Sequence, residues 1–372
     1  MQPIARSGLT AAQVTALIQT ASAVEVDSGL ELLDMGLNVV ADISADLRGG
    51  SVSRASYATL HGTASLAVSR ELDWANALVR PYMTMTDGIN TARFNLGAYL
   101  TSSPRTETGE SPVTWAVDGY DILHVLNTPI GDAYTVAAGV GYLAAAERVL
   151  LDQGIVRYNI DQTSAAAVLG SPRVWVLDTQ TTWLNVVNAL LAAIGYQGVW
   201  SDWDGRLQLG PYQSPTDRGP EWVYDTGPDT SMLAPKQVTV RDYFNAPNRW
   251  VFYWSKDPSL GAPTEGNGVY TYVNYTYGVT SVNARGRVIT APPVQVDAAD
   301  QASLVTQAQS AIDADLRLKT TFEVSVFPNP LHWHFDRLTV AGSQLGTIMD
   351  VLVSKWTLPL DGSDGPQEWQ LL

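Results

Sequence analysis

The sequence contains no cysteine and only four histidines in 372 residues. Without cysteine there is no disulfide framework, no thiolate nucleophile and no zinc–thiolate site. With only four histidines, few imidazole ligands are available for a metal centre that uses several of them. The chain must therefore be stabilised by its core, and a chain of this length can bury a large one.

Positive charge is scarce as well. Lysine and arginine number 22 against 37 aspartates and glutamates, so the formal net charge is −15. A surface that holds nucleic acid by its phosphates needs the opposite balance. The composition therefore argues against a nucleic-acid-binding protein.

Long hydrophobic runs are also missing. The first 26 residues are interrupted by Gln13, Thr15 and Gln19, which break the continuous apolar segment that a signal peptide needs. No later run is apolar enough to span a bilayer. We therefore expect a soluble protein that is made in a cytoplasm and is not stably inserted in a membrane.

Aromatic residues, by contrast, are plentiful, with 12 tryptophans and 16 tyrosines, and this composition favours strands. The fold class that the patterns predict is mainly β with α+β parts, in which two β-barrel-like domains are joined by an α+β middle segment. The middle segment has two helical patterns, the second with Thr181 or Thr182 as a cap and Gly195 as a stop, and then a tight hairpin at Asp204-Gly205.

The predicted domain boundaries follow the changes in pattern. They are 1–23 for an N-terminal arm or helix outside the main domain, 24–131 for the first β-barrel-like domain, 132–235 for the α+β middle domain, and 236–372 for the second β-barrel-like domain, which includes a helix at 298–318.

That helix has the clearest pattern in the chain. Its apolar positions follow a single helical stripe, namely Leu304, Val305, Ala308, Ala311, Ile312 and Leu316. Asp297 or Asp300 is placed to cap the start, and Lys319 closes the end. We expect the stripe to be buried.

Immediately after the helix the apolar period falls to two, which indicates strands. Phe322, Val324 and Val326 alternate with polar residues, and Pro328-Asn329-Pro330 is a turn signal. Leu331, Trp333 and Phe335 then alternate with His332, His334 and Asp336. We therefore predict a β-hairpin across residues 322–336.

The same segment raises the question of a metal site. On a strand, His332, His334 and Asp336 share one face, as ligands from an H-x-H-x-D pattern would. Arg337 follows where a metallohydrolase motif of this kind would have histidine, and only His61 and His124 remain to complete a shell. We prefer a solvent-facing or subunit-facing strand surface, with no metal ligands.

A glycine motif suggests a dinucleotide site. Gly139, Gly141 and Ala144 match G-x-G-x-x-A, and Asp161 follows at about the ~20-residue spacing of a ribose-binding acid. The preceding residues are not a continuous buried strand, and no series of βαβ units follows. The alternative is a set of small residues where a helix packs closely, and we expect no cofactor.

Carboxylates and tryptophans also occur in groups that could act on glycans. Three acidic pairs could be presented as a glycosidase pair, namely Asp202 with Asp204, Glu107 with Glu110, and Glu221 with Asp225. Six tryptophans could form a sugar-stacking platform or serve as buried anchors, namely Trp200, Trp203, Trp222, Trp250, Trp254 and Trp333. Acidic loops and a packed core explain these groups equally well.

Taken in order, nine segments resemble one known family. They are LELLDM at 30–35, GGSVSRAS at 49–56, SRELDWANALVRPYM at 69–83, FNLGAYLTSSP at 94–104, WAVDGYDILHVL at 115–126, GYLAAAERVLLDQG at 141–154, the run 183–212, VTVRDYFNAPNRWVFYW at 238–254, and the 298–318 helix with FPNPLHWHFDRLTVAG. This order is similar to that of minor tail proteins of long-tailed actinobacteriophages, which are related to baseplate-hub and tail-associated hub proteins. The N-terminal arm and the residues after Trp356 match least clearly.

The resemblance implies a structural hub at the phage tail tip, part of the virion. Its chains would form a homotrimer whose two β-barrel-like domains per chain make a ring of six similar units. The ring would join the distal tail protein and tail tube to receptor-binding or spike proteins, with the tape-measure protein ending in its lumen. It further implies no enzymatic activity, with no catalytic, cofactor-binding or metal residues. The net charge of −15 suits a lumen through which DNA passes without specific binding. The alternative is a glycan-binding or glycan-cleaving tail component that contacts the host cell wall.

Overall fold

We describe the chain from a computed structural model. It describes residues 1–19, 24–102, 104–107, 113–176, 180–225, 232–241, 243–244, 246–254, 264–296, 298, 300–317, 320–341 and 348–372. Strands predominate, with helices in the middle of the chain and after residue 300, so the predicted class, mainly β with α+β parts, is confirmed. Among the described residues no helix is both long and apolar enough to cross a bilayer.

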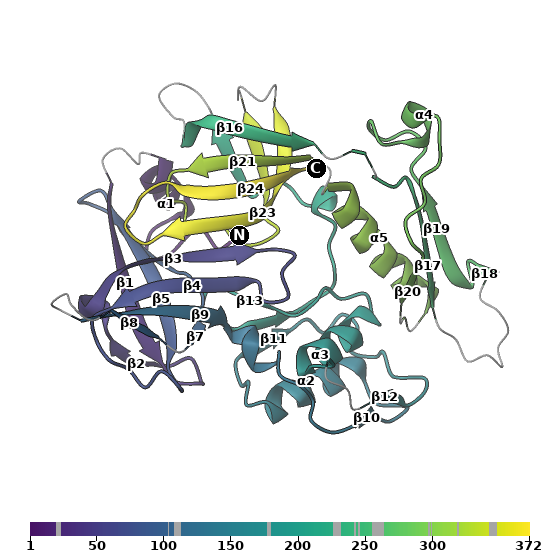
Figure 1. Cartoon of the computed structure of the whole chain (residues 1–372), viewed down its shortest axis with the longest axis horizontal. Helices are drawn as coiled ribbons and strands as arrows, with labels where there is room; N and C mark the ends of the chain where they lie inside the picture. Colours follow the sequence, from purple (N-terminus) through teal and green to yellow (C-terminus); the bar gives the residue numbers. More distant parts are fainter. Residues whose placement is uncertain are drawn as a thin grey trace.

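One large sheet forms the body of the molecule, and Figure 1 shows its strands side by side. Its path runs β16-β21-β24-β23-β3-β4-β9-β7-β5-β1-β2, and β15, β22, β6 and β8 pair at its sides. From the first third of the chain come β1 (Glu25–Leu33), β2 (Val39–Asp42), β3 (Leu47–Ala55), β4 (Gly62–Val68), β5 (Leu78–Thr86), β6 (Thr91–Asn95), β7 (Tyr99–Thr101), β8 (Arg105–Glu107) and β9 (Thr114–Asp121). From the later part come β15 (Trp222–Asp225), β16 (Leu233–Arg241), β21 (Thr320–Val326), β22 (Arg337–Ala341), β23 (Met349–Pro359) and β24 (Gly365–Leu371).

The antiparallel pair β23–β3 connects the two ends of the chain. Its register runs from Lys355 opposite Ala55 to Pro359 opposite Ser51. Beside it, Gly50 has a φ of 143°, and a Cβ there would lie 2.2 Å from the carbonyl oxygen of Ser65. The close approach of β3 to β4 therefore needs glycine at this position. Strands from both segments that the sequence analysis assigns to β domains thus belong to one hydrogen-bonded path.

The N-terminal helix is part of this body. Helix α1 (Ala11–Gln19) forms as predicted, but Val14, Leu17 and Ile18 are buried in the same core as β1, β5 and β21–β24. The expected position outside the main domain is therefore wrong. The apolar face of α1 packs on the main core, because an amphipathic helix buries its apolar side against a neighbouring apolar surface.

The middle of the chain forms a second core below the sheet in Figure 1. It contains η3 (Ile122–Val125), β10 (Tyr134–Val136), α2 (Tyr142–Asp152), β11 (Tyr158–Ile160), β12 (Arg173–Trp175), α3 (Trp183–Ala192), β13 (Trp200–Ser201), β14 (Leu207–Leu209) and η4 (Pro215–Asp217). Thr182 caps α3 in a capping box with Asn185, as predicted. The predicted hairpin is present too, because β13 and β14 are antiparallel and Gly205 has a φ of 88°.

The third part is a small unit at the right of Figure 1, in which helix α5 lies against a four-stranded sheet. Its elements are β17 (Arg249–Trp254), β18 (Thr264–Glu265), β19 (Gly268–Val273), α4 (Val282–Arg285), β20 (Val294–Val296) and α5 (Gln301–Arg317). A short 3-10 turn, η2 (Ser44–Asp46), completes the elements of the body.

Most of the prediction for helix α5, its buried apolar stripe and its cap, is confirmed. Leu304, Ala308 and Ile312 are fully buried against β17 and β19, whereas Ala311 is exposed. The carboxylate of Asp300 accepts a 2.8 Å hydrogen bond from the Ser303 backbone and so caps the helix. The other proposed cap, Asp297, and the expected last residue, Lys319, lie outside the described residues.

The predicted hairpin after α5 is wrong in its second half. Strand β21 forms, with Phe322, Val324 and Val326 buried, but it pairs with β16 and β24. Residues 331–336 form a loop, and the next strand, β22, begins only at Arg337. Phe335 has a φ of 61°, which no regular strand contains. The alternation of apolar residues in this loop reflects insertion into a core rather than strand pairing.

Candidate functional site at the central cleft

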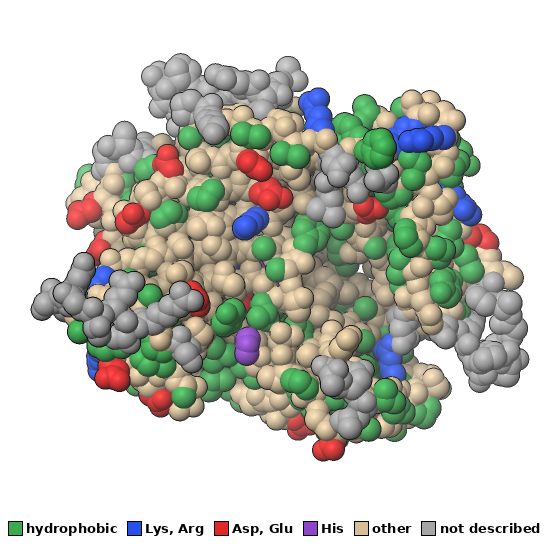
Figure 2. All heavy atoms as spheres, in the orientation of Figure 1, with side chains coloured by type: hydrophobic (Ala, Val, Ile, Leu, Met, Phe, Trp, Pro, Cys, Tyr) green, Lys and Arg blue, Asp and Glu red, His purple; other side chains and the backbone are tan. Residues whose placement is uncertain are grey.

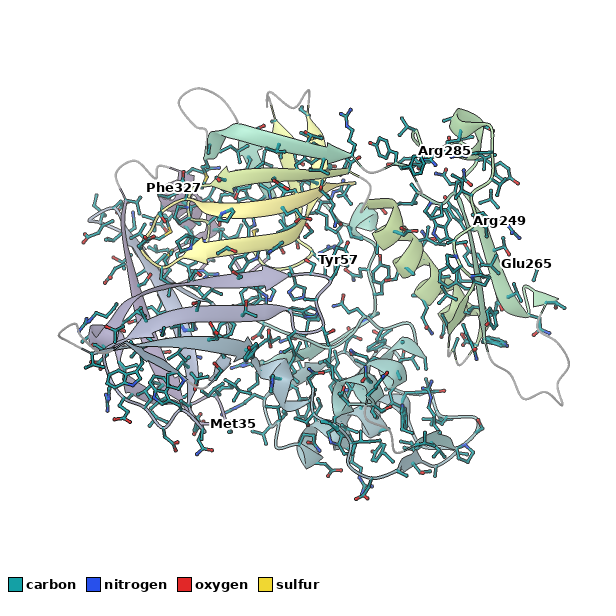
Figure 3. The ribbon with its side chains drawn as sticks, viewed as in Figure 1. Met35, Tyr57, Arg249, Glu265, Arg285 and Phe327 are labelled. Atoms are coloured by element: carbon teal, nitrogen blue, oxygen red, sulfur yellow. The ribbon has the colours of Figure 1, made fainter. Side chains whose placement is uncertain are left out.

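A cleft of about 850 Å³ lies where the three parts of the chain face one another. One wall is the turn from Ser56 to His61 between β3 and β4, on which Figure 3 labels Tyr57. The second wall is formed by Asn185 and Asn188 of α3, and the third by Thr306 and Ser310 of α5. Figure 2 shows the corresponding hollow between the body and the α5 unit. Because each wall belongs to a different part of the chain, any movement between the parts changes this cleft.

The loop that replaces the predicted hairpin forms the floor of the cleft. Within it, the Nε2 atom of His332 lies 2.5 Å from the Tyr224 hydroxyl, and Nδ1 of His332 lies 3.5 Å from the Asp336 carboxylate. The Met1 ammonium lies 2.5 Å from the other oxygen of Asp336. Burial alone would raise the pKa of Asp336, but the Met1 ammonium and His332 outweigh it and hold that pKa below its ordinary value. The floor is thus a buried, internally neutralised set of charges.

A second buried polar group ties the floor to the sheet and to the middle part. The Arg54 guanidinium of β3 lies 3.3 Å from the Asp121 carboxylate and 3.9 Å above the Trp333 ring. It donates to the Ser201 carbonyl at 3.2 Å, and the Ser201 hydroxyl donates to Asp121 at 2.6 Å. Both charged side chains are essentially inaccessible to solvent. Such a pair holds its surroundings in one arrangement, because separating the charges in a dry interior is costly.

Two histidines stack at the edge of the cleft. The rings of His61 and His334 are 4.7 Å apart between centroids and nearly parallel. Burial, together with the nearby Arg54 charge, lowers the pKa of His61 to about 4. Burial and the His61 ring likewise hold the pKa of His334 well below its ordinary value. Both rings are therefore neutral at neutral pH, and their contact is one of packing.

The H-x-H-x-D segment does not form a shared strand face. His332 and Asp336 are buried in the floor, while His334 turns toward His61, so the expected solvent-facing or subunit-facing surface is wrong. The left-handed Phe335 breaks the alternation that a strand would impose. In the described part of the chain, no three potential ligands among His, Asp and Glu gather closely enough to hold a metal ion.

The glycine motif lies in a different setting from a dinucleotide site. Gly141 is the residue before α2, and the strand before it, β10, pairs antiparallel with β12. A Cβ at Gly141 would lie 3.7 Å from Ala144 and 3.8 Å from the Ala167 carbonyl. Asp161 is engaged locally, because it accepts hydrogen bonds from the backbone and hydroxyl of Thr163. These distances are ordinary van der Waals contacts, so Gly141 packs at the start of a helix without an approach that only glycine allows.

The carboxylate pairs have structural partners. Asp202 accepts hydrogen bonds from the Asp204 and Arg206 backbones and from Gln208, which shapes the β13–β14 turn. Burial raises the pKa of Asp202. Glu221 accepts from the Arg337 backbone at 2.9 Å. Of the pair Glu107 and Glu110, Glu110 lies outside the described residues.

The six tryptophans divide between core and cleft. Trp222, Trp250, Trp254 and Trp333 are buried, so they are anchors of the core. Trp200 and Trp203 are half-buried and line the cleft. The Trp200 ring meets the His334 ring edge-on, with 5.1 Å between centroids. The six residues therefore do not form one exposed platform.

No sequence motif marks the Arg54–Asp121–Ser201 group. Its members are separated by dozens of residues, and each lies in an ordinary alternating strand pattern. Only the arginine in the GGSVSRAS segment indicates a buried ion pair, because a charged residue at an inward-facing strand position needs a partner. Chemically, the described charged groups at the cleft neutralise one another, which leaves amide, hydroxyl and aromatic groups to face any occupant.

The fold can now be compared with those of known proteins. The sequence matches no family model and no curated protein. In three dimensions the chain has the fold of phage tail proteins. The tail protein from Neisseria meningitidis MC58 aligns with a TM-score of 0.66 and 12% identity, over 93% of this chain and 96% of that chain.

Two prophage proteins give the same result. The 43 kDa tail protein of prophage MuSo2 from Shewanella oneidensis has a TM-score of 0.61 and 12% identity, over 93% of this chain and 98% of that chain. A prophage tail protein from Listeria monocytogenes EGD-e has a TM-score of 0.52 and 12% identity, over 92% and 94%. The resemblance to phage tail proteins is thus confirmed at the level of the fold. The narrower resemblance, to actinobacteriophage proteins, stays a prediction.

Proposed function

We propose that this chain is a structural hub of a phage tail tip or baseplate. Three copies form a ring beneath the tail tube, and each contributes two β units, from segments 24–131 and 236–372, on either side of the middle segment 132–235. The ring contacts the distal tail protein and tail tube on one side and receptor-binding or spike proteins on the other. The tape-measure protein and the DNA occupy its lumen, where the acidic surface gives phosphates no specific site.

The observation that carries this proposal is the extent of the fold match. The alignment with the Neisseria tail protein spans nearly all of both chains, so it includes the body, the middle part and the α5 unit together. A single catalytic domain inserted in an unrelated chain would match only in part. The internally paired charges at the cleft also support a scaffold without catalytic residues. On the same grounds we propose a virion component rather than an enzyme.

The proposal is tested by removing the gene for the chain from its phage and restoring it in trans. We expect particles without functional tails after the deletion, and normal tails after complementation. Labelled chain should appear at the tail tip by electron microscopy, and the purified chain should have the mass of a trimer in light scattering. Infectious phage with complete tails in the absence of the chain would rule out a structural hub.

A glycan-binding or glycan-cleaving role is the second candidate. The observation in its favour is the pair of half-buried tryptophans, Trp200 and Trp203, beside the amide side chains of the cleft. Soluble cell-wall polysaccharide should then quench the fluorescence of the wild-type chain but not of Trp200→Ala. If neither binding nor hydrolysis is detected across host cell-wall polymers, this role is excluded.

A further inference from the structure

The charge of the chain is unevenly distributed along its length. Segment 236–296 contains six lysines and arginines against three acidic residues, although the whole chain has a net charge of −15. Most of this segment forms the unit at the right of Figure 1. Figure 2 shows more basic than acidic side chains over that unit, and more acidic than basic side chains along the opposite flank, where β1 lies. The two ends of the molecule's longest axis therefore differ in charge.

At the basic end, aromatic side chains are unusually exposed around α4. Phe244, Tyr277 and Tyr275 expose 80%, 64% and 59% of their surface. Exposed Arg241 and Arg287 make no ion pair with any described residue. We call Arg241, Phe244, Tyr275, Tyr277, Arg285 and Arg287 the basic cap. Arginine and aromatic residues together are the composition that dominates binding at protein interfaces.

Hydrogen bonds fix the backbone that carries the basic cap. Arg285 donates hydrogen bonds to the backbone carbonyls of Tyr243, Phe244 and Ala246, which fixes the segment that carries Phe244. Fully buried Asn248 donates to the Arg287 carbonyl at 3.0 Å and accepts from the Ile289 backbone at 2.7 Å. Holding aromatic residues rigidly in water has no benefit for folding, but it lowers the entropy cost of binding.

The opposite end of the molecule has complementary charge. Glu25 lies opposite Thr86 in the β1–β5 register, next to Asp87, and Val26 lies against Gly362 between Asp361 and Asp364. We call Glu25, Asp27, Asp87, Asp361 and Asp364 the acidic flank. All five are exposed, and none forms an ion pair with a described cation. Ile89, which is 91% exposed, adds an apolar contact beside them.

We propose that the basic cap of one copy docks on the acidic flank of a second copy, and that three such contacts close the ring. This inference rests on the trimeric hub of the proposed function and names its interface. One chain cannot join its own cap and flank, because α4, which carries Arg285, lies at the right of Figure 1 and β1, which carries Glu25 and Asp27, lies at the left. A contact between two different surfaces of identical chains is head-to-tail, and it closes into a ring when the rotation per copy permits.

The test reverses charge at each surface separately. The cap variant is Arg241→Glu/Arg287→Glu, and the flank variant is Glu25→Arg/Asp364→Arg. All four side chains are exposed, and within the described part of the chain none of them forms a hydrogen bond that would be lost. The matched control is Arg148→Glu/Arg206→Glu, which makes the same charge change as the cap variant at exposed positions of the middle part. Each variant is checked for wild-type circular dichroism and thermal unfolding, and its mass is followed by sedimentation velocity against concentration.

We expect the cap and flank variants each to dissociate to monomers, with a dissociation constant raised at least about tenfold. The control should remain trimeric. The variant with all four substitutions should recover the trimer, since each contact again joins opposite charges. An equimolar mixture of cap and flank variants should give pairs or open chains but no closed trimer, because two kinds of subunit cannot alternate around a ring of three.

Three results would overturn the inference. The first is a cap variant that associates as tightly as the control. The second is a wild-type chain that stays monomeric at its highest soluble concentration. The third is a cap that binds an acidic polymer such as polyglutamate while the trimer persists in the cap variant. In the first and third cases, trimers that still join tails leave the hub function intact. A wild-type chain that neither trimerises nor joins tails contradicts the hub function as well.

Discussion

The two regions that face each other across the cleft, the sheet body and the α5 unit, are stabilised in different ways. The body combines an apolar core that includes both ends of the chain with the fully buried Arg54–Asp121 pair. The α5 unit has a small core whose buried members, among the described residues, are Trp250, Phe252, Trp254, Leu304, Ala308 and Ile312. All six come from one stretch of the chain, so this core can form or open without disturbing the body.

Polar contacts hold the α5 unit to the rest of the chain. Asp313 of α5 accepts hydrogen bonds from the Tyr212 and Ser214 hydroxyls of the middle part at 3.2 and 2.9 Å, and the Tyr243 hydroxyl lies 2.6 Å from that of Thr320 in β21 of the body. Water can replace such contacts at small cost. From this difference we expect the body to unfold as one unit, whereas the α5 unit should be able to open locally. The following predictions test that distinction.

The largest effect is expected in the body, from Arg54→Ala. This change leaves the Asp121 carboxylate buried without its partner, which should lower the free energy of unfolding by about 3–5 kcal/mol. Urea denaturation of the full chain, followed by tryptophan fluorescence, measures the loss. Arg48→Ala, an exposed position on the same strand, should change it by less than about 0.5 kcal/mol. Equal effects of the two substitutions would mean that the pair adds nothing.

In the α5 unit, Ile312→Asp should have the next largest effect. It places a charge in the small core, at a cost of about 3–4 kcal/mol. Because this core is local, hydrogen exchange should accelerate in β17, β19 and α5 while β3 and β23 stay protected. Ala311→Asp, on the exposed face of the same helix, is the matched control. Loss of protection in β3 and β23 as well would show that the two regions unfold together.

The histidine stack at the cleft makes stability depend on pH. The folded-state pKa of His61, about 4, lies below the ordinary 6.5, so between these values the unfolded chain binds a proton that the folded chain excludes. Neutral His61 therefore contributes fully to the free energy of unfolding above about pH 6.5. As the pH falls toward 4 this contribution, about 3 kcal/mol, is lost. His61→Gln should flatten the measured slope between pH 6.5 and 4. His124→Gln, at an exposed histidine, is the control, and a slope unchanged by His61→Gln would exclude His61 as its source.

The sequence predicted best what depends on neighbouring residues. The buried stripe of α5, the Thr182 cap and the Asp204-Gly205 turn each follow from a few consecutive side chains, and the structure contains all three. The same local reasoning failed between Leu331 and Asp336, where alternation suggested a strand. There, Trp333 enters the core beneath Arg54, and Phe335 has a left-handed backbone conformation. Burial in a loop and burial on a strand can give the same pattern of residues.

Long-range pairing could not be predicted. The β23–β3 ladder joins residues about 300 positions apart, and no local pattern identifies a strand's partner. For the same reason the candidate site was missed. Arg54, Asp121 and Ser201 meet only because three separate strands end at one place. The residues that looked chemical in the sequence, such as the Gly139 motif and the Asp202 pair, shape turns and helix starts that local geometry explains.

The smallest predicted effect concerns the start of α5 and again separates the two regions. Asp300→Ala removes the carboxylate that accepts from the Ser303 backbone, and an uncapped helix start costs about 1 kcal/mol. Asp300→Asn keeps an acceptor of the same shape and should retain most of that stability, which distinguishes the cap from a general effect of charge. Hydrogen exchange at the first turn of α5 should rise in the alanine variant alone, with the body unchanged. If the asparagine variant exchanges as fast as the alanine variant, the stabilisation comes from the negative charge acting on the helix dipole rather than from the hydrogen bond.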